Sequence, residues 1–247
     1  QAIYGWAGAD VKRFQQEPAE EIVLPQSYRV PKKVQHIANN ILSRIPDERR
    51  IKKEWKARDE DGRIHPVTSI EDVPLHKGKW LVLARYNDKL IKLKPFLRDR
   101  GIYFEYKKRK SYPTRLYAAV QNYTRWTQGA LLSISECKDL FEYFGKEFPR
   151  KEERLYDLKE FGYSNTQRWF EVFETEPEDS LYIRTMLQAG EELSKEARVK
   201  LSTIHAAKGG EAENVLLILD NTKMIREAIE KSPDKEDEEN RIWYVGV

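Results

Sequence analysis

The sequence predicts an α/β fold in which a parallel sheet is interrupted by an inserted all-helical subdomain. Two apolar strands, at residues 80–84 and 102–106, flank a helical pattern, which is the spacing of a crossover unit in a parallel sheet. Residues 113–198 are rich in aromatic side chains at helical spacing and contain no convincing apolar strand. Short β-rich runs return at residues 199–204 and 215–219, so elements on both sides of the helical segment complete one sheet.

The first elements of the fold are a strand and an amphipathic helix. Residues 22–24, Ile-Val-Leu, predict a short buried strand that ends at Pro25. Residues 27–31 indicate a turn that leads into a helix, with its proline near the first helical position. Apolar side chains then recur at helical spacing over residues 34–45, and Pro46 ends the pattern.

The next elements form the crossover itself. Residues 47–78 are charged and rich in turn formers, and predict an edge strand at most. After the strand Trp-Leu-Val-Leu-Ala, Asn87 is a candidate helix cap and Gly101 a candidate terminator. Pro95 lies inside this helix and should bend it.

The composition excludes several classes of protein. With 247 residues, 34% charged and 11% aromatic, the chain can bury a core and is not disordered. No apolar run is long enough for a membrane span, and no secretory signal is visible, so a cytoplasmic location is expected. The single cysteine, Cys137, excludes an internal disulfide and a cysteine-rich zinc site, and no metal site is predicted.

One basic run is a candidate for binding nucleic-acid phosphates. It contains Lys107, Lys108, Arg109, Lys110 and Arg115, interleaved with Tyr106 and Tyr112. Several cations with nearby aromatic rings suit phosphate contact with single-stranded or duplex DNA. A solvated linker entering the helical segment is the alternative interpretation, and the net charge of +3 permits either.

The stretch Ser202-Thr-Ile-His-Ala-Ala-Lys-Gly-Gly-Glu211 holds the most chemistry. It follows a predicted strand and places Thr203, His205, Lys208 and Glu211 around Gly209 and its neighbour. Glycines let the backbone approach a phosphate or a sugar closely, and the hydroxyl, imidazole and ammonium groups can contact phosphates. Taken alone, the stretch also fits a polar loop between a strand and a helix.

Five stretches, in order along the chain, resemble motifs of superfamily 1 DNA helicases of the UvrD/Rep/PcrA type. The segment 1–9 resembles motif III, 26–29 motif IV, 80–85 the strand of motif IVa, 202–211 motif V, and 238–247 the start of motif VI. This resemblance implies a RecA-like fold of the P-loop NTPase type. It also implies an ATP-dependent helicase that translocates on single-stranded DNA and unwinds duplex DNA, with 3′-to-5′ polarity.

The resemblance implies a domain organisation. The sequence contains no G-x-x-x-x-G-K-[ST] phosphate loop. We therefore expect a second motor domain that works with the first motor domain of the same polypeptide, binds ATP with Mg²⁺ whose ligands lie outside this chain, and is inactive alone. The expected division is 1–16 as a tail of the first motor domain, 17–112 and 199–247 as the RecA-like domain, and 113–198 as a short 2B-type insertion.

The resemblance also assigns nucleotide-binding residues. Gln1 corresponds to a glutamine that senses the γ-phosphate and Arg29 to an arginine that reaches it, which makes both candidate catalytic residues. Tyr28 corresponds to an aromatic residue that packs on the nucleotide, and Glu211, beside Gly209, to the acid that binds the ribose hydroxyl. A solvated terminal residue is the alternative for Gln1, and a surface ion pair is the alternative for Arg29.

The DNA-binding residues follow in the same way. Tyr4 and Trp6 correspond to aromatic side chains that stack on bases, which any base permits. Thr203, His205 and Lys208 correspond to motif V residues at the DNA surface. Core packing is the alternative for the two aromatic residues, and a structural hydrogen bond is the alternative for His205.

Two rival functions remain open at this point. The first keeps the fold without the motor, as a DNA-binding or regulatory module of a degenerate helicase. The second is the motor part of a helicase–nuclease of the RecB or AddA kind. A phosphate loop upstream in the parent gene would exclude the first, and a nuclease domain downstream would favour the second.

Overall fold

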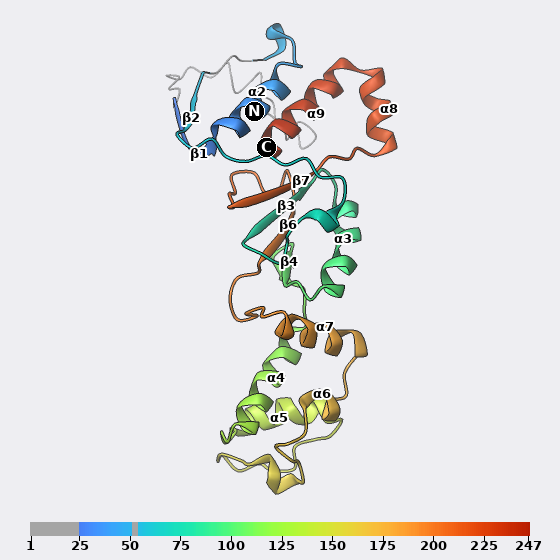
Figure 1. Cartoon of the computed structure of the whole chain (residues 1–247). Coiled ribbons are helices and arrows are strands. Elements are labelled where there is room, and N and C mark those ends of the chain that lie inside the picture. Colours follow the sequence, from blue (N-terminus) through green and yellow to red (C-terminus); the bar gives the residue numbers. More distant parts are fainter. Residues whose placement is uncertain (1–24, 51–53) are drawn as a thin grey trace, which may run out of the picture. The chain divides into compact units, whose positions relative to one another are not determined.

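The structure is a computed structural model that describes residues 25–50 and 54–247 (Figure 1). It divides into two compact units. The first contains the described residues up to Lys94 together with Arg198–Val247, and the second contains Pro95–Ala197. The second unit thus begins before residue 113, and the domain boundaries expected from the sequence stay a prediction.

The first unit contains the parallel strands. Its elements are β1 (Gln26–Pro31), α2 (Lys32–Leu42), η2 (Asp47–Arg49), β2 (Lys56–Arg58), η3 (Ile70–Asp72), β3 (Trp80–Ala84), β6 (Val199–Thr203), β7 (Asn214–Ile218), α8 (Lys223–Lys231) and α9 (Pro233–Gly246). Helix α3 (Asn87–Asp99) follows β3 and contains Pro95, and the boundary between the units falls within it. The strands predicted at residues 80–84, 199–204 and 215–219 are therefore confirmed to within a residue or two.

Strand β3 lies between β6 and β7 and is parallel to both (Figure 1). Trp80 is opposite Val199 and Asn214, and Ala84, at the other end, is opposite Thr203 and Ile218. The Val-Leu-Ala end of β3 is buried, as an apolar run in a parallel sheet requires. This arrangement confirms the predicted α/β fold with a parallel sheet, and it places the carboxyl ends of all three strands at one edge.

The turn predicted at residues 27–31 is wrong, because the segment is strand β1, paired in parallel with β2. The amide of Gln26 donates to the carbonyl of Ala57 at 3.0 Å, and the backbone N–H of Lys56 donates to the carbonyl of Pro25 at 2.6 Å. Pairing with a distant segment therefore decides the conformation of a polar stretch that has no strand-like alternation. The strand expected at residues 22–24 lies outside the described residues.

Helix α9 packs on the sheet through a small apolar core. Leu83, Ile204 and Ile242 are its buried members, and Leu217 and Trp243 pack against them. Helices α2 and α9 lie side by side (Figure 1). Helix α2 ends at Leu42, earlier than Pro46, and its Ala38 and Ile41 are buried as the helical spacing predicts.

The second unit is mainly helical. Besides the end of α3 it contains β4 (Phe104–Tyr106), β5 (Arg109–Lys110), α4 (Thr114–Thr127), α5 (Ile134–Tyr143), η4 (Leu158–Phe161), α6 (Trp169–Val172) and α7 (Pro177–Gln188). Aromatic rings dominate its core, with Tyr123 and Phe173 in edge contact at 5.4 Å between ring centroids. Cys137 is fully buried on α5, and desolvation raises the pKa of its thiol to about 12, so the group is inert packing.

Candidate nucleotide and nucleic-acid site

Arg29 on β1 contacts a turn that lies 180 residues further along the chain. Its Nη1 donates a hydrogen bond to the carbonyl oxygen of Gly209 at 2.8 Å. Its Nε lies 3.4 Å from Oε2 of Glu211. The structure therefore brings together three of the five residues that the sequence relates to the nucleotide. A fourth, Tyr28, precedes Arg29 on the same strand, and Gln1 lies outside the described residues.

Both side chains of this ion pair face solvent. Arg29 is 56% exposed and Glu211 is 70% exposed. An ion pair in such surroundings contributes roughly 0–1 kcal/mol to stability, because water competes for both groups. The contact therefore orients the arginine only weakly, and a phosphate can compete with Glu211 for it.

Tyr28 is 86% exposed, which is unusual for a large aromatic side chain. The serine that precedes it organises this part of β1, because Oγ of Ser27 accepts a hydrogen bond from the backbone N–H of Val30 at 3.2 Å. A ring presented in this way has no role in the core of the first unit. It is available for packing against a flat ligand such as a nucleobase.

The turn that contains Gly209 starts directly at the carboxyl end of β6. Oγ1 of Thr203 accepts a hydrogen bond from the N–H of Ala206 at 3.3 Å, and the carbonyl of Thr203 accepts one from Ala207 at 3.0 Å. Gly209 has a φ of +85°, in the left-handed region that favours glycine. The hydroxyl and the glycine thus shape the turn that carries His205 and Lys208, so those two candidate residues share one short segment with Thr203.

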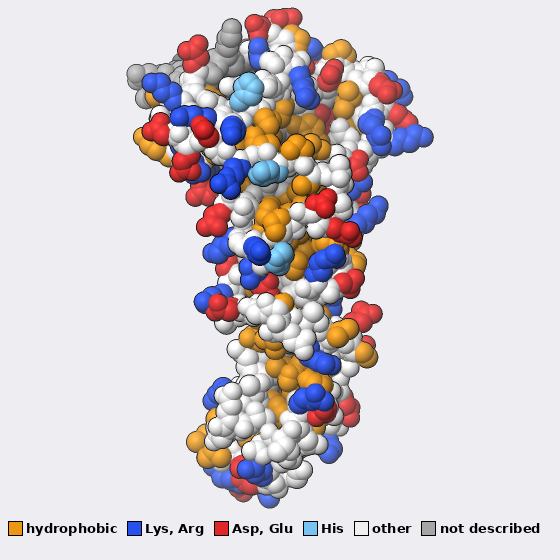
Figure 2. All heavy atoms as spheres, in the orientation of Figure 1, with side chains coloured by type: hydrophobic (Ala, Val, Ile, Leu, Met, Phe, Trp, Pro, Cys, Tyr) orange, Lys and Arg blue, Asp and Glu red, His pale blue; other side chains and the backbone are white. Residues whose placement is uncertain are grey.

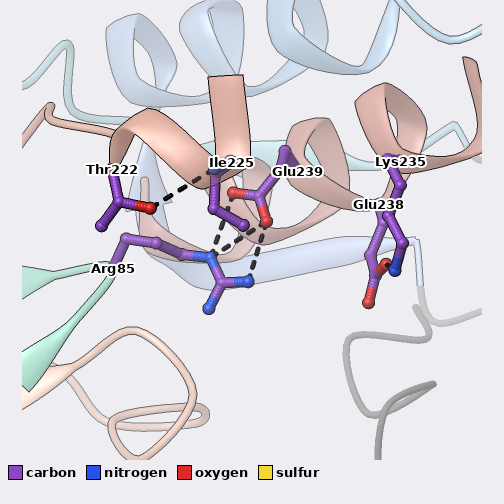
Figure 3. Close-up of polar contacts among 6 residues, drawn as sticks. All are labelled: Arg85, Thr222, Ile225, Lys235, Glu238 and Glu239. Atoms are coloured by element: carbon purple, nitrogen blue, oxygen red, sulfur yellow. Dashed lines mark hydrogen bonds and ion pairs between the residues drawn. The ribbon is translucent and has the colours of Figure 1, made fainter. Parts of the chain in front are cut away.

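A buried ion pair holds α9 at the same edge of the sheet. Arg85, directly after β3, donates from Nε and Nη2 to the carboxylate of Glu239 at 2.8–3.1 Å (Figure 3). The two side chains are only 14% and 7% exposed. Burial by itself lowers the pKa of the Arg85 guanidinium, but the hydrogen bond and the charge of Glu239 outweigh it, so the pKa is raised.

Further polar contacts fix α9 around this pair. Tyr86 lies against Arg85, with 4.7 Å between the guanidinium and the ring centroid, and desolvation followed by the charge of Glu239 raises its pKa to about 12. The buried carboxylate of Asp237 lies 3.2 Å from Nε of Arg49. Sequence reasoning did not single out these contacts, because they join residues that lie far apart in the chain or carry no role in the motif that contains them.

Gly246 completes the attachment of α9. A Cβ at this position would lie 3.0 Å from Cδ1 of Ile204 and 3.2 Å from Cδ1 of Leu217. The helix therefore lies so close to the sheet that a side chain at this position would require its neighbours to shift by a few tenths of an ångström. Because Ile204 lies between Thr203 and His205, the position of α9 is coupled to that of the candidate DNA-binding turn.

The remaining candidate residues lie elsewhere. Gln1, Tyr4 and Trp6 fall outside the described residues. Lys107, Lys108 and Arg109 are exposed and belong to the second unit. Within residues 25–50 and 54–247, no group of three or more His, Cys, Asp or Glu side chains could hold a metal ion. No helix in these two ranges is long and apolar enough to cross a bilayer.

The parallel sheet, with this polar turn at the carboxyl end of a strand, is the architecture of a RecA-like α/β domain. The model of the UvrD-like helicase C-terminal domain family matches residues 105–247, which is more than half of the chain. The chain therefore belongs to this family. No curated protein shows significant similarity to the sequence.

Proposed function

We propose that this chain supplies one wall of the ATP site and part of the DNA track of an ATP-dependent helicase with 3′-to-5′ polarity. The observation that carries the proposal is the contact of Arg29 with Gly209 and Glu211. It joins two segments that are distant in sequence and that the sequence separately relates to nucleotide binding. Membership in the UvrD-like family supports the helicase role itself.

The wall has the chemistry that a nucleoside triphosphate requires. Arg29 carries a permanent charge on a planar group that suits phosphate oxygens. Glu211 can accept hydrogen bonds from ribose hydroxyls, and the exposed ring of Tyr28 can pack on the base. These side chains bind and orient ATP. The phosphate loop and the Mg²⁺ ligands are expected from the first motor domain of the same polypeptide, so this chain alone is expected to be inactive.

The DNA track is proposed to follow the turn after β6. Thr203, His205 and Lys208 supply a hydroxyl, an imidazole and an ammonium group on one short segment, a set that suits the sugar–phosphate backbone. Gln1 is proposed to sense the γ-phosphate, and Tyr4 and Trp6 to stack on the bases of a single strand.

The test is the Arg29→Ala variant of the full-length polypeptide that carries this chain. DNA-stimulated ATP turnover should fall by about 10³-fold or more, since an arginine on a transferring phosphoryl group contributes on this scale. The melting temperature should stay unchanged, because the side chain is exposed. Arg63→Ala, which removes another exposed arginine of the same unit, is the matched control and should retain normal turnover.

Two results would contradict the proposal. Near-normal turnover in Arg29→Ala at an unchanged melting temperature would remove the arginine from the ATP site. A wild-type protein without DNA-stimulated turnover would instead indicate a non-catalytic DNA-binding module. Polarity is tested separately, by whether a strand is displaced from a duplex with a 3′ tail and not from one with a 5′ tail.

A further inference from the structure

The basic run of the second unit forms the tip of a β-hairpin. Strands β4 and β5 are antiparallel, with Tyr106 opposite Arg109 and Glu105 opposite Lys110. The connecting turn consists of two residues, Lys107 and Lys108. Both have positive φ, at 52° and 61°, and they are the non-glycine residues with positive φ in the described part of the chain.

This turn is made from unfavourable residues. A two-residue hairpin with positive φ at both positions normally contains Asn-Gly, Asp-Gly or Gly-Gly. An L-residue with a long side chain costs about 1–2 kcal/mol at each such position. Two adjacent lysines also repel each other. Backbone strain of this kind clusters at functional sites, so the two lysines are candidates for a functional role.

The base of the hairpin is rigidly held within the second unit. Oγ of Ser111 accepts a hydrogen bond from the N–H of Phe104 at 3.2 Å and lies 2.7 Å from the hydroxyl of Tyr182. The buried hydroxyl of Tyr112 donates to the carbonyl of Leu193 at 2.6 Å. The tip is therefore presented on a fixed support, which reduces the entropy that its cations lose on binding.

The charge at the tip has one sign. Residues 107–110 are Lys-Lys-Arg-Lys, all four are exposed, and Glu105, the nearest carboxylate along the hairpin, is opposite Lys110. On the face shown in Figure 2, basic and acidic side chains are interspersed over both units. A concentrated group of cations on a rigid support is suited to a polyanion.

We propose that the tip formed by Lys107, Lys108 and Arg109 binds the phosphate backbone of duplex nucleic acid. The inference rests on the proposed function and specifies a contact outside its ATP wall and single-strand track. Single-strand sites need exposed rings on which bases stack. Here Tyr106 is half-buried beneath Lys107, whose Nζ lies 5.4 Å from the ring centroid, and Tyr112 is buried. The tip therefore offers charge without a stacking platform, which fits a duplex whose bases are inaccessible.

The size of the effect follows from counterion release. Each neutralised phosphate adds about 0.9 to the slope of log affinity against log salt concentration. Loss of two lysine contacts should reduce this slope by about 2 and weaken duplex binding roughly 10- to 30-fold at physiological salt. The loss of affinity should be similar for duplexes of every base sequence, because phosphate contacts carry no sequence information.

The test is the double variant Lys107→Gly/Lys108→Gly in the full chain, with a blunt-ended duplex oligonucleotide as the probe at several salt concentrations. Glycine removes both charges and relieves the strain, so stability should stay the same or rise while duplex affinity falls. If the lysines instead had a structural role, the double variant would be less stable than the wild type. Lys138→Ala/Lys151→Ala changes the net charge equally at exposed positions of the same unit and should leave the slope unchanged.

Two comparisons make the outcome decisive. Binding of a single-stranded oligothymidine should change much less than duplex binding, and Lys107→Asn/Lys108→Gly should repeat the result with a different turn. Unchanged duplex affinity and slope in both variants would overturn the proposal, and so would an equal loss for both probes. Neither result would affect the ATP wall, which is tested by turnover in Arg29→Ala.

Discussion

Two arginine–glutamate pairs of the first unit that join distant segments, Arg29–Glu211 and Arg85–Glu239, differ mainly in their surroundings. Arg29 and Glu211 are 56% and 70% exposed, with a single ion-pair contact of 3.4 Å. Arg85 and Glu239 are 14% and 7% exposed, and three hydrogen bonds of 2.8–3.1 Å join them. Both pairs join segments that are far apart in sequence, and both lie in the unit that contains the parallel sheet.

The difference separates a binding contact from a structural one. Water screens the exposed pair, so exchanging its partner for a phosphate costs little. The buried pair has lost its hydration, and each group depends on the other for compensation. Arg29 is thus suited to meet a ligand, whereas Arg85 is suited to fix α9 next to the turn that carries Thr203 and His205.

The largest predicted effect on stability is that of Arg85→Ala. The variant leaves the carboxylate of Glu239 buried without its partner, which should lower the free energy of unfolding by about 3–5 kcal/mol. Arg29→Ala should lower it by less than about 1 kcal/mol. Denaturant unfolding of the two variants measures both values under identical conditions.

A paired substitution separates charge from packing. Arg85→Met/Glu239→Leu replaces both charges by apolar side chains and should recover most of the stability lost in Arg85→Ala. If Arg85→Ala is no more destabilised than Arg29→Ala, the buried pair does not hold α9, and the contrast between the two pairs has no energetic basis.

Substitution of a glycine near each pair should have a smaller effect on stability. Gly246 lies in α9, which the buried pair holds, and Gly209 accepts a hydrogen bond from Arg29 of the exposed pair. Gly246→Ala should destabilise by about 1–3 kcal/mol, because the new Cβ would crowd the buried side chain of Ile204. Gly209→Ala meets open space, and its cost of about 1 kcal/mol should come from the positive φ alone. Thermal melts of both variants check the order, and a larger loss for Gly209→Ala would contradict the close approach of α9.

Strands β3 and β7 could be predicted because each contains a short apolar run. Strand β3, Trp-Leu-Val-Leu-Ala, is buried between two parallel neighbours and therefore has a continuous hydrophobic signal. Strand β1 has the sequence Gln-Ser-Tyr-Arg-Val-Pro and lacks this signal. Its conformation depends on pairing with β2, which local sequence does not show.

The sequence identified site residues only where they belong to a motif that is continuous along the chain. Arg29, Gly209 and Glu211 were named from separate motifs, and the structure adds that they touch. Arg85 and Glu239 belong to the segments 80–85 and 238–247 that resemble two motifs, but their pairing was missed, because 154 residues separate them and local sequence does not show which side chains meet. The sequence showed the hairpin tip only as a basic run and did not predict the hairpin, because two lysines are not a typical turn sequence such as Asn-Gly.

A third pair, Arg125 and Glu136 of the second unit, lies between the two extremes. Nη1 of Arg125 is 2.8 Å from Oε1 of Glu136, and the side chains are 53% and 26% exposed. Glu136 also accepts a hydrogen bond from the backbone N–H of Ser133 at 2.8 Å, in a capping box that begins α5. This backbone hydrogen bond, followed by the contacts with Arg125 and the Ser133 hydroxyl, outweighs desolvation and lowers the pKa of Glu136.

The smallest predicted effect is the pH dependence that this carboxylate confers. Because its folded pKa is lowered, Glu136 stabilises the protein above its unfolded pKa of about 4.3, and this contribution is lost as the pH falls through the folded value. At neutral pH, Glu136→Gln should cost about 0.3–1 kcal/mol, the usual contribution of an acid in the first turn of a helix. The difference between wild type and variant should disappear at a pH below the folded pKa. Unfolding curves at neutral and acidic pH measure it, and a difference that persists in acid would show that the carboxylate charge is not its source.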